Sequence, residues 1–237
     1  MKPLIVCHIV GATEGKLQTR PLSSPNKGLP KNTLHKINEL ITDKLGAQGW
    51  IVSSKNMKKL ARGKRKLIPE TQRNLHQTFI GHRRGSRITL TIDPDGKLYY
   101  GKSHSAKDHF VAMLSTQVSG EYLTVLREEG ISYVFAGETG NDYHQALGTL
   151  YQDFGVEILL LDGGDVIIGQ FLQEGLIDEL SLLFYPGIKD LSSSTSLLNI
   201  PLDIKELLEH RWVLRLISCE SLENGFIWMR YAIEKKQ

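Results

Sequence analysis

A pair of glycines after an apolar run is the first candidate for chemistry. Gly163 and Gly164 follow the apolar stretch 156–161 and precede an amphipathic run that contains Phe171 and Leu172. This order predicts a strand, a tight turn and a helix, and the backbone N–H groups at such a helix start can bind phosphate. Tight turns also need glycine for positive φ when no ligand is present. The pair alone therefore leaves open whether a dinucleotide binds there.

Three acidic residues stand at turns that follow predicted strands. Glu14, Asp93 and Asp162 are candidates for substrate contacts or for proton delivery. Glu14 and Asp93 can equally be turn residues, and Asp162 can be a hydrogen-bonding residue at a strand end. The residue types do not decide between these roles.

Histidines and cysteines give weaker candidates. His8 lies inside the first predicted strand, where a hydrogen-bonded core residue is expected rather than a catalyst. His104 and His109 could meet a phosphate or simply lie in an exposed loop. Cys7 and Cys219 have apolar, strand-like surroundings, and we expect both to be buried small hydrophobic residues. The sequence contains no metal-ligand spacing and no Ser-His-Asp arrangement, which argues against a metalloenzyme or a hydrolase.

The apolar patterns place these candidates on strands that alternate with helices. This alternation predicts one domain over residues 1–237, an α/β fold with a mostly parallel sheet flanked by helices and an antiparallel edge from Glu179 onward. Ligands of such sheets bind beyond the carboxyl ends of the strands, which here means the loops after Val10, Ser53, Ile92, Ala136 and Leu161. Strands are expected over 4–10, 49–54 and 87–92, then a return after the turn 93–96, and further strands over 109–115, 131–137, 156–162, 178–188, 211–222 and 225–233. Helices are expected over 34–45, 122–129, 143–154 and around Phe171.

Positive charge is concentrated in one segment. From Lys55 to Arg87 there are eleven Lys or Arg residues and one acid, Glu70, whereas the whole chain has a formal net charge of only +3. The segment has little periodicity, as an insertion at about 55–87 would have. It could bind RNA, an acidic partner or a phosphorylated small molecule, or it could be a solvated loop. Only Phe79 and a few histidines interrupt the charges, so the aromatic platform of a single-strand binder is missing.

Composition restricts the class of protein. The chain has 237 residues, 41% of them hydrophobic, which is enough to bury a core. Its apolar runs are shorter than the roughly 18 to 20 residues that span a bilayer, and its first residues lack a signal-peptide cleavage pattern. We therefore expect a cytoplasmic protein with no membrane segment.

Longer motifs give a family resemblance. The runs "LLLDGGDVIIGQFLQEGLIDELSLLFYPGI" (159–188), "YLTVLREEGISYVFAG" (122–137) and "GFIWMRYAI" (225–233) resemble the reductase domain of riboflavin-biosynthesis deaminase/reductases. That family has a dihydrofolate-reductase-like fold, and the resemblance extends from residue 4 to residue 233. It implies an NADPH-dependent reductase of a pyrimidine that carries a ribityl or ribosyl phosphate, usually a homodimer.

The resemblance also implies cofactor contacts. The loop from Ala12 to Gly15 would flank the nicotinamide, and Ser53, Ser54 and Lys55 would lie near the adenosine phosphate. The pyrophosphate would rest on the turn after the strand that ends near residue 162. The residues expected at that turn are Gly163, Gly164, Asp165, Val166 and Gly169.

Several positions depart from the family motifs. Glu14 replaces an aspartate, and Lys55 stands where the family has an arginine, so a bidentate guanidinium is replaced by a point charge. Asp165 replaces a glycine beside the expected pyrophosphate. Two like charges about 4 Å apart cost roughly 4 kcal/mol at an effective dielectric near 20. Alternatively, Asp165 is simply the N-cap of the helix.

These departures leave three hypotheses open. The first is a reductase with a divergent substrate, for example a related pterin-like ring. The second is a non-catalytic member of the fold that binds a nucleotide, a flavin precursor or a partner macromolecule. The third is a nucleic-acid-associated protein that uses residues 55–87, and it predicts binding that weakens steeply with salt.

Overall fold

The computed structural model describes residues 1–12, 32–61, 63–64, 76–83, 87–105, 107–162, 164–187 and 212–235. Contacts within the chain cluster in two compact units. The first unit comprises residues 1–3 and 47–159, and the second comprises residues 4–46 and 160–237. The single domain over 1–237 stays a prediction.

The first unit is built on parallel strands. β2 (Gly49–Ser53), β3 (Arg87–Ile92) and β5 (Asp108–Leu114) pair in that order, all parallel. The short β4 (His104–Ser105) pairs antiparallel with the start of β5, and β6 (Ser132–Phe135) pairs parallel with its later part. β3, β5 and β6 are almost entirely buried, as expected for parallel strands that are covered on both faces.

A serine caps the start of one helix of the first unit, and a glycine ends another. α3 (Gly120–Glu128) begins after Ser119, whose hydroxyl accepts the Tyr122 N–H at 3.3 Å. α4 (Tyr143–Phe154) has the bounds expected from sequence and ends at Gly155, which has a φ of 65°. α2 (Ser54–Met57) is a single short turn that was not expected. An aromatic-rich core lies beneath these elements and includes Met57, Tyr100, Phe110, Tyr122, Leu123, Leu126, Tyr133 and Phe135.

The prediction of a return strand after the 93–96 turn is wrong. β3 ends at Ile92, and Leu98 and Tyr100 are buried without being part of any strand. The cause is Asp93, whose carboxylate accepts the N–H groups of Lys97 at 3.1 Å and Leu98 at 3.0 Å. Those two N–H groups are then not available for a β ladder.

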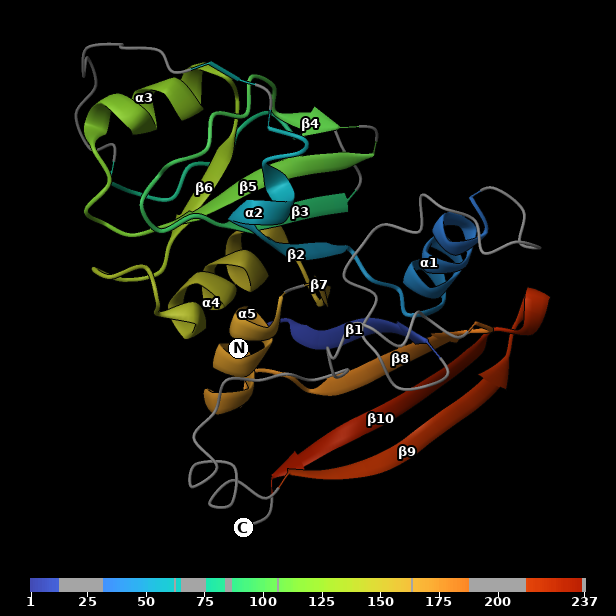
Figure 1. Ribbon diagram of the computed structural model, residues 1–237. Coiled ribbons are helices and arrows are strands. Elements are labelled where there is room, and N and C mark those ends of the chain that lie inside the picture. The colour runs from blue at the N-terminus through green and yellow to red at the C-terminus, as the bar shows by residue number, and fades with distance from the viewer. Residues whose placement is uncertain are drawn as a thin grey trace. The chain divides into compact units, whose positions relative to one another are not determined.

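The second unit combines parallel and antiparallel pairing. β1 (Leu4–Ala12) and β8 (Glu179–Tyr185) are parallel, whereas β10 (Ile227–Lys235) runs antiparallel to β8. β9 (Trp212–Ser221) pairs antiparallel with β10, and the two strands are drawn in red in Figure 1. The expected α/β fold with an antiparallel C-terminal edge is therefore confirmed. The edge begins one strand later than expected, because β8 itself pairs parallel with β1.

Two helices and a short turn complete the second unit. α1 (Thr33–Lys44) buries Ile37 and Ile41, and Gly46 follows it with a φ of 64°. α5 (Asp165–Gln173) follows β7 (Ile158–Asp162), a strand that starts in the first unit and ends in the second. The turn η1 (Glu223–Gly225) joins β9 to β10.

Candidate functional site

The start of α5 has a glycine as its N-cap. This residue, Gly164, has a φ of −73° and supplies no side-chain cap to the first turn. A Cβ added at Gly164 would meet no atom within 4 Å. Val166, in the same turn, is 60% exposed. Backbone N–H groups of the first helical turn need partners from outside the helix, and the space at Gly164 lets a ligand approach them.

Asp165 is the first helical residue and not the N-cap, so the alternative that made it the N-cap is wrong. The side chain of Asp165 and the whole of Gly163 lie outside the described part of the chain. Glu14 and Gly15 also lie outside it. Gly169 is buried within α5, and Ala12 is fully buried as the last residue of β1, paired with Tyr185 of β8.

Asp162 ends β7, and its side chain is exposed. The pKa of the Cys7 thiol is raised to about 12, mainly by burial and to a smaller extent by the negative charge of the Asp162 carboxylate. Cys7 is therefore a buried neutral thiol, as expected. Cys219 is also a free cysteine, but it is exposed, so the expectation that it is buried is wrong. It lies on β9, which solvent reaches along most of its length.

In the first unit, the residues expected near the adenosine phosphate lie at the end of β2. Ser53 is the N-cap of α2, and its hydroxyl accepts the Asn56 N–H at 3.2 Å. Ser54 is half-buried, and Lys55 is exposed. The ammonium group of Lys55 is a single charge at the surface and cannot form the two-pronged hydrogen bonds of a guanidinium.

Asp93, the other acidic candidate of the first unit, is 2% exposed. Its carboxylate accepts the Tyr122 hydroxyl at 3.3 Å in addition to the N–H groups of Lys97 and Leu98. The Tyr122 hydroxyl also lies 2.7 Å from the Leu98 carbonyl oxygen. These contacts support the interpretation of Asp93 as a residue that holds the 93–98 turn.

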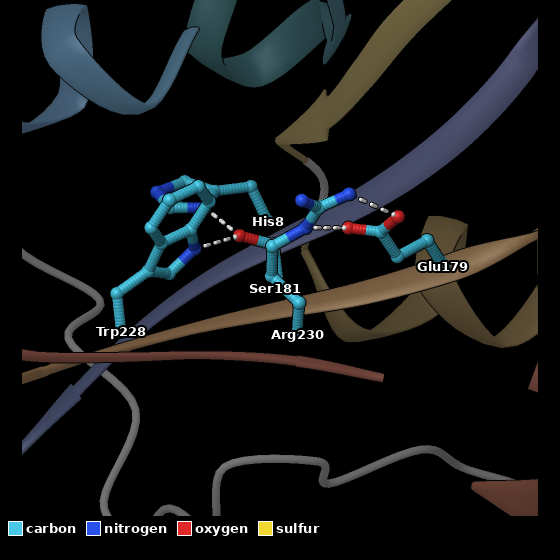
Figure 2. A network of polar contacts seen from close by, with 5 residues as sticks. All are labelled: His8, Glu179, Ser181, Trp228 and Arg230. Carbon is cyan, nitrogen blue, oxygen red and sulfur yellow. Dashed lines mark hydrogen bonds and ion pairs between the residues drawn. The ribbon is translucent and has the colours of Figure 1, made fainter. Parts of the chain in front are cut away.

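His8 belongs to a buried polar chain in the second unit (Figure 2). The Trp228 indole N–H donates to the Ser181 hydroxyl oxygen at 2.8 Å, and that oxygen lies 2.9 Å from His8 Nδ1. His8 Nε2 is 3.4 Å from Asn38 Oδ1 on α1. Burial lowers the pKa of His8 to about 4, so the ring is neutral. His8 is the hydrogen-bonded core residue that its place in the sequence suggests.

Beside this chain, Arg230 binds Glu179 with two hydrogen bonds, at 2.6 and 2.8 Å (Figure 2). Ser181 and Trp228 were not predicted as partners of His8. The signal for Ser181 was a serine inside the apolar strand "ELSLLFY", on a strand that pairs with the one carrying His8.

His104 and His109 are not alike. His104 is half-buried on β4, whereas His109 is 0% exposed on β5, so the exposed-loop interpretation of His109 is wrong. His109 Nε2 lies 2.7 Å from the Ser132 hydroxyl, which also accepts the Gly81 N–H at 2.9 Å. Burial is the main cause that lowers the pKa of His109 to about 4.

Within the described ranges, no group of three or more His, Cys, Asp or Glu side chains is placed to hold a metal ion. In that same part of the chain, none of the helices combines the length and the apolar character needed to cross a membrane.

Solved structures share this fold. A pyrimidine reductase-like protein from Corynebacterium diphtheriae has a TM-score of 0.63 and 16% identity, over 99% of this chain and 93% of that chain. RibD from Acinetobacter baumannii has a TM-score of 0.61 and 14% identity, over 98% of this chain, which spans 58% of that longer protein. The riboflavin biosynthesis reductase Rib7 from Saccharomyces cerevisiae gives a TM-score of 0.56 and 11% identity, over 98% of this chain and 90% of that chain.

Sequence comparison gives the family. No curated protein matches the chain. The model of the RibD C-terminal domain matches residues 41–189, which is more than half of the 237 residues. The expected family and its dihydrofolate-reductase-like fold are thereby confirmed. The chain belongs to the RibD C-terminal domain family.

Proposed function

We propose that this protein is an NADPH-dependent reductase of the pyrimidine-reductase type, and that it works as a homodimer. Its substrate would be a phosphorylated ribosylamino-pyrimidine or a related pterin-like ring. The observation that carries the proposal is the uncapped start of α5 with open space at Gly164, in a chain of the RibD C-terminal domain family. A similar structure, from Thermotoga maritima, is described as a diaminohydroxyphosphoribosylaminopyrimidine deaminase and 5-amino-6-(5-phosphoribosylamino)uracil reductase, which supports this substrate class.

In this proposal the second unit holds the pyrophosphate of NADPH. The N–H groups at the start of α5 would bind it, as helix N-termini bind phosphates. Gly164 would allow close approach because it has no Cβ, and Gly163 would act in the same way. Ala12 and Gly15 would border the nicotinamide, which supplies the hydride when the cofactor is bound.

Some of the charged candidate residues would contact the cofactor, and others would contact the substrate. Lys55, with Ser53 and Ser54, would meet the adenosine phosphate as a flexible cation. Asp162 and Glu14 would contact the substrate or deliver the proton that accompanies hydride transfer. Asp93 is buried and accepts hydrogen bonds from three donors. We therefore assign it to stabilising the 93–98 turn and not to binding the substrate.

Titration of the purified protein with NADPH, followed by nicotinamide fluorescence, tests the proposal. We expect binding in the micromolar range and at least about a tenfold loss in Gly164→Ala, because the added methyl group would occupy the space the phosphate needs. The fold should tolerate this change, since the new Cβ meets no atom within 4 Å. Gly148→Ala in α4 is the matched control, because its Cβ would meet only Met1 O at an ordinary 3.7 Å.

Asp165→Gly separates the remaining hypotheses. If the native protein binds no NADPH and Asp165→Gly does, the cofactor site is closed by one carboxylate and the protein is a non-catalytic relative. If neither protein binds NADPH, the reductase proposal is wrong. Stronger binding by Asp165→Gly than by an already active native protein would fit the proposal, since it removes a like charge beside the pyrophosphate.

A further inference from the structure

Basic and polar side chains of the first unit meet at β4 and at the starts of β5 and β6. His104 of β4 pairs with His109 of β5 in the antiparallel register, and side chains that pair in this way lie on the same face of a sheet. His109 Nε2 lies 2.7 Å from the Ser132 hydroxyl on β6, and the Gly81 N–H donates to the same oxygen at 2.9 Å. The chain after Gly81 therefore starts beside these histidines.

Two further basic residues, His82 and Arg83, follow directly and are exposed. The pKa of His109 is lowered to about 4, mainly by burial and then by the positive charges of Arg83, His104 and His82. This order agrees with the contacts, because only nearby charges shift the pKa of a buried group strongly. Three basic side chains thus lie close to one buried, neutral imidazole.

The two outer histidines have ring nitrogens that the described part of the chain does not use. The His82 ring makes no hydrogen bond there, and His104 uses only Nδ1, which lies 3.3 Å from the Ser103 hydroxyl. Arg83 Nη1 donates to the Phe154 carbonyl oxygen at 3.3 Å, and a guanidinium has five N–H donors in all. The group can therefore still donate hydrogen bonds to a ligand.

Several acidic residues lie near this group, and two of them already have partners. Asp108, the first residue of β5, forms an ion pair with Arg87 at 3.0 Å. The Glu129 carboxylate accepts a backbone N–H at 2.9 Å, and Asp153 of α4 is exposed. Two exposed lysines flank β4 along the chain, Lys102 and Lys107. Positive charge therefore exceeds negative charge at this place.

We propose that His82, Arg83 and His104 bind a phosphate group. Arginine and protonated histidine form charge-assisted hydrogen bonds with phosphate oxygens. The guanidinium supplies a permanent charge, whereas imidazoles are cations only in acid solution. Binding should therefore strengthen as the pH falls from 8 to 6.

This phosphate site is separate from the cofactor contacts proposed above. Ser53 lies at the carboxyl ends of the parallel strands β2 and β3, where it pairs with Ile92. The basic group lies at the amino ends, where Arg87 pairs with Asp108. The length of β3 separates the two edges by roughly 16 Å, at about 3.3 Å per residue. One phosphate cannot reach both edges, and the proposal does not depend on the reductase function.

Titration with sulfate at two pH values provides the main test. Sulfate stays a dianion from pH 6 to pH 8, so a change in affinity must come from the protein. In isothermal titration calorimetry, we expect binding about tenfold tighter at pH 6 than at pH 8. At pH 6, His82→Gln and Arg83→Gln should each weaken it about tenfold, because each removes a charge-assisted hydrogen bond. His144→Gln is the matched control, because His144 is exposed on α4 of the same unit.

Nitrogen-15 NMR of the histidine rings locates the bound anion. Sulfate should shift the ring signals of His82 and His104, which would contact it, and of His109 beside them. The His8 ring of the second unit is enclosed in its own hydrogen-bonded chain and should not shift. Unchanged signals of His82, His104 and His109 at saturating sulfate would overturn the proposal.

Two phosphate compounds distinguish the possible sources of the phosphate group. Inorganic phosphate and ribose 5-phosphate are titrated at pH 6. Tighter binding of ribose 5-phosphate would assign the site to a phosphate monoester, whereas equal or tighter binding of inorganic phosphate would assign it to the free ion. Failure of both to bind would contradict the proposal.

Other results would also overturn the assignment. Sulfate binding that is independent of pH, or that His82→Gln and Arg83→Gln leave unchanged, would not use this group. Binding that NADPH displaces and Lys55→Gln abolishes would belong to the cofactor site. Urea denaturation without sulfate checks the fold, and His82→Gln should leave it intact because His82 is exposed. A protein that binds sulfate as expected but no NADPH would refute only the reductase proposal.

Discussion

Two buried histidines, one in each unit, are paired with a serine on a neighbouring parallel strand. His8 of β1 lies opposite Ser181 of β8, at 2.9 Å, and His109 of β5 lies 2.7 Å from Ser132 of β6. In both cases burial is the main cause that lowers the pKa of the imidazole to about 4. Both rings are therefore neutral near pH 7, although they were expected to have different roles.

The second ring nitrogen distinguishes the two pairs. His8 Nε2 reaches the Asn38 side chain at 3.4 Å, so the imidazole connects β8 to α1. His109 Nδ1 is buried and has no hydrogen-bond partner among the described residues. An unpaired buried polar group costs about 1 to 3 kcal/mol. The comparison shows that the same residue type in the same kind of strand can complete a polar chain or leave part of it unsatisfied.

Acidification should lower the free energy of unfolding, because both buried histidines have lowered pKa values. This is the largest effect that we expect. The folded-state pKa values of the two histidines, about 4, lie below the usual 6.5. The unfolded chain therefore binds more protons between these values, and stability is lost as pH falls from 6.5 towards 4. At pH 5 we expect a loss of about 2 kcal/mol per histidine, or about 4 kcal/mol for both. Urea denaturation at pH 7 and pH 5 measures it.

Single substitutions assign this pH effect to its sources. His8→Leu or His109→Leu should each remove about half of the stability lost between pH 7 and pH 5. His144→Gln, on an exposed position of α4, is the control and should leave the loss unchanged. An undiminished loss in both buried-site variants would mean that neither histidine is responsible.

At constant pH 7, the same two substitutions should lower the free energy of unfolding by unequal amounts. This difference is the next largest effect that we expect. His8→Leu removes the partner of the Ser181 hydroxyl and of Asn38, and we expect it to cost about 3 kcal/mol. His109→Leu also removes an unpaired nitrogen, and Ser132 keeps the Gly81 N–H, so about 1 kcal/mol is expected. Equal costs in urea denaturation would contradict the distinction between the two pairs.

Much of the fold could be predicted because it depends on local patterns. The period of the apolar residues and a glycine directly after the last turn gave α4 its bounds, and apolar runs located β1, β5 and β8. The return strand after Asp93 could not be excluded in this way. Its absence depends on a carboxylate that binds N–H groups four and five residues ahead, a competition that strand propensity does not include.

The candidate site was less predictable because it depends on burial and long-range pairing. Asp93 and Asp162 both follow apolar strands, yet one is buried with three donors and the other is exposed. Sequence spacing cannot separate them, since Tyr122, which completes the Asp93 site, lies 29 residues away. Nor could the partners of His8 be identified, because Ser181 is 173 residues distant along the chain.

The smallest expected effect concerns the direction of the hydrogen bonds in the His8 chain. An indole N–H can only donate, so Trp228 uses an acceptor lone pair of Ser181, whose own O–H can then donate to His8 Nδ1. The remaining proton of His8 is on Nε2, which agrees with a carbonyl oxygen of Asn38 as its neighbour. Every group of the chain is satisfied only in this direction.

Trp228→Phe should therefore cost about 1 kcal/mol from the lost hydrogen bond and should also change the tautomer of His8. Nitrogen-15 NMR of the histidine rings should show mainly the Nε2–H form of His8 in the native protein and a larger share of the Nδ1–H form in Trp228→Phe, because loss of the indole donor leaves both lone pairs of Ser181 open to Nδ1–H. A single form in both proteins would mean that Trp228 does not set the direction. His109 provides the internal reference, since the donor to its serine is the backbone of Gly81. Gly81 admits no side chain, because a Cβ there would lie 2.2 Å from the Gly130 oxygen, so this backbone donor is the same in the native protein and in Trp228→Phe.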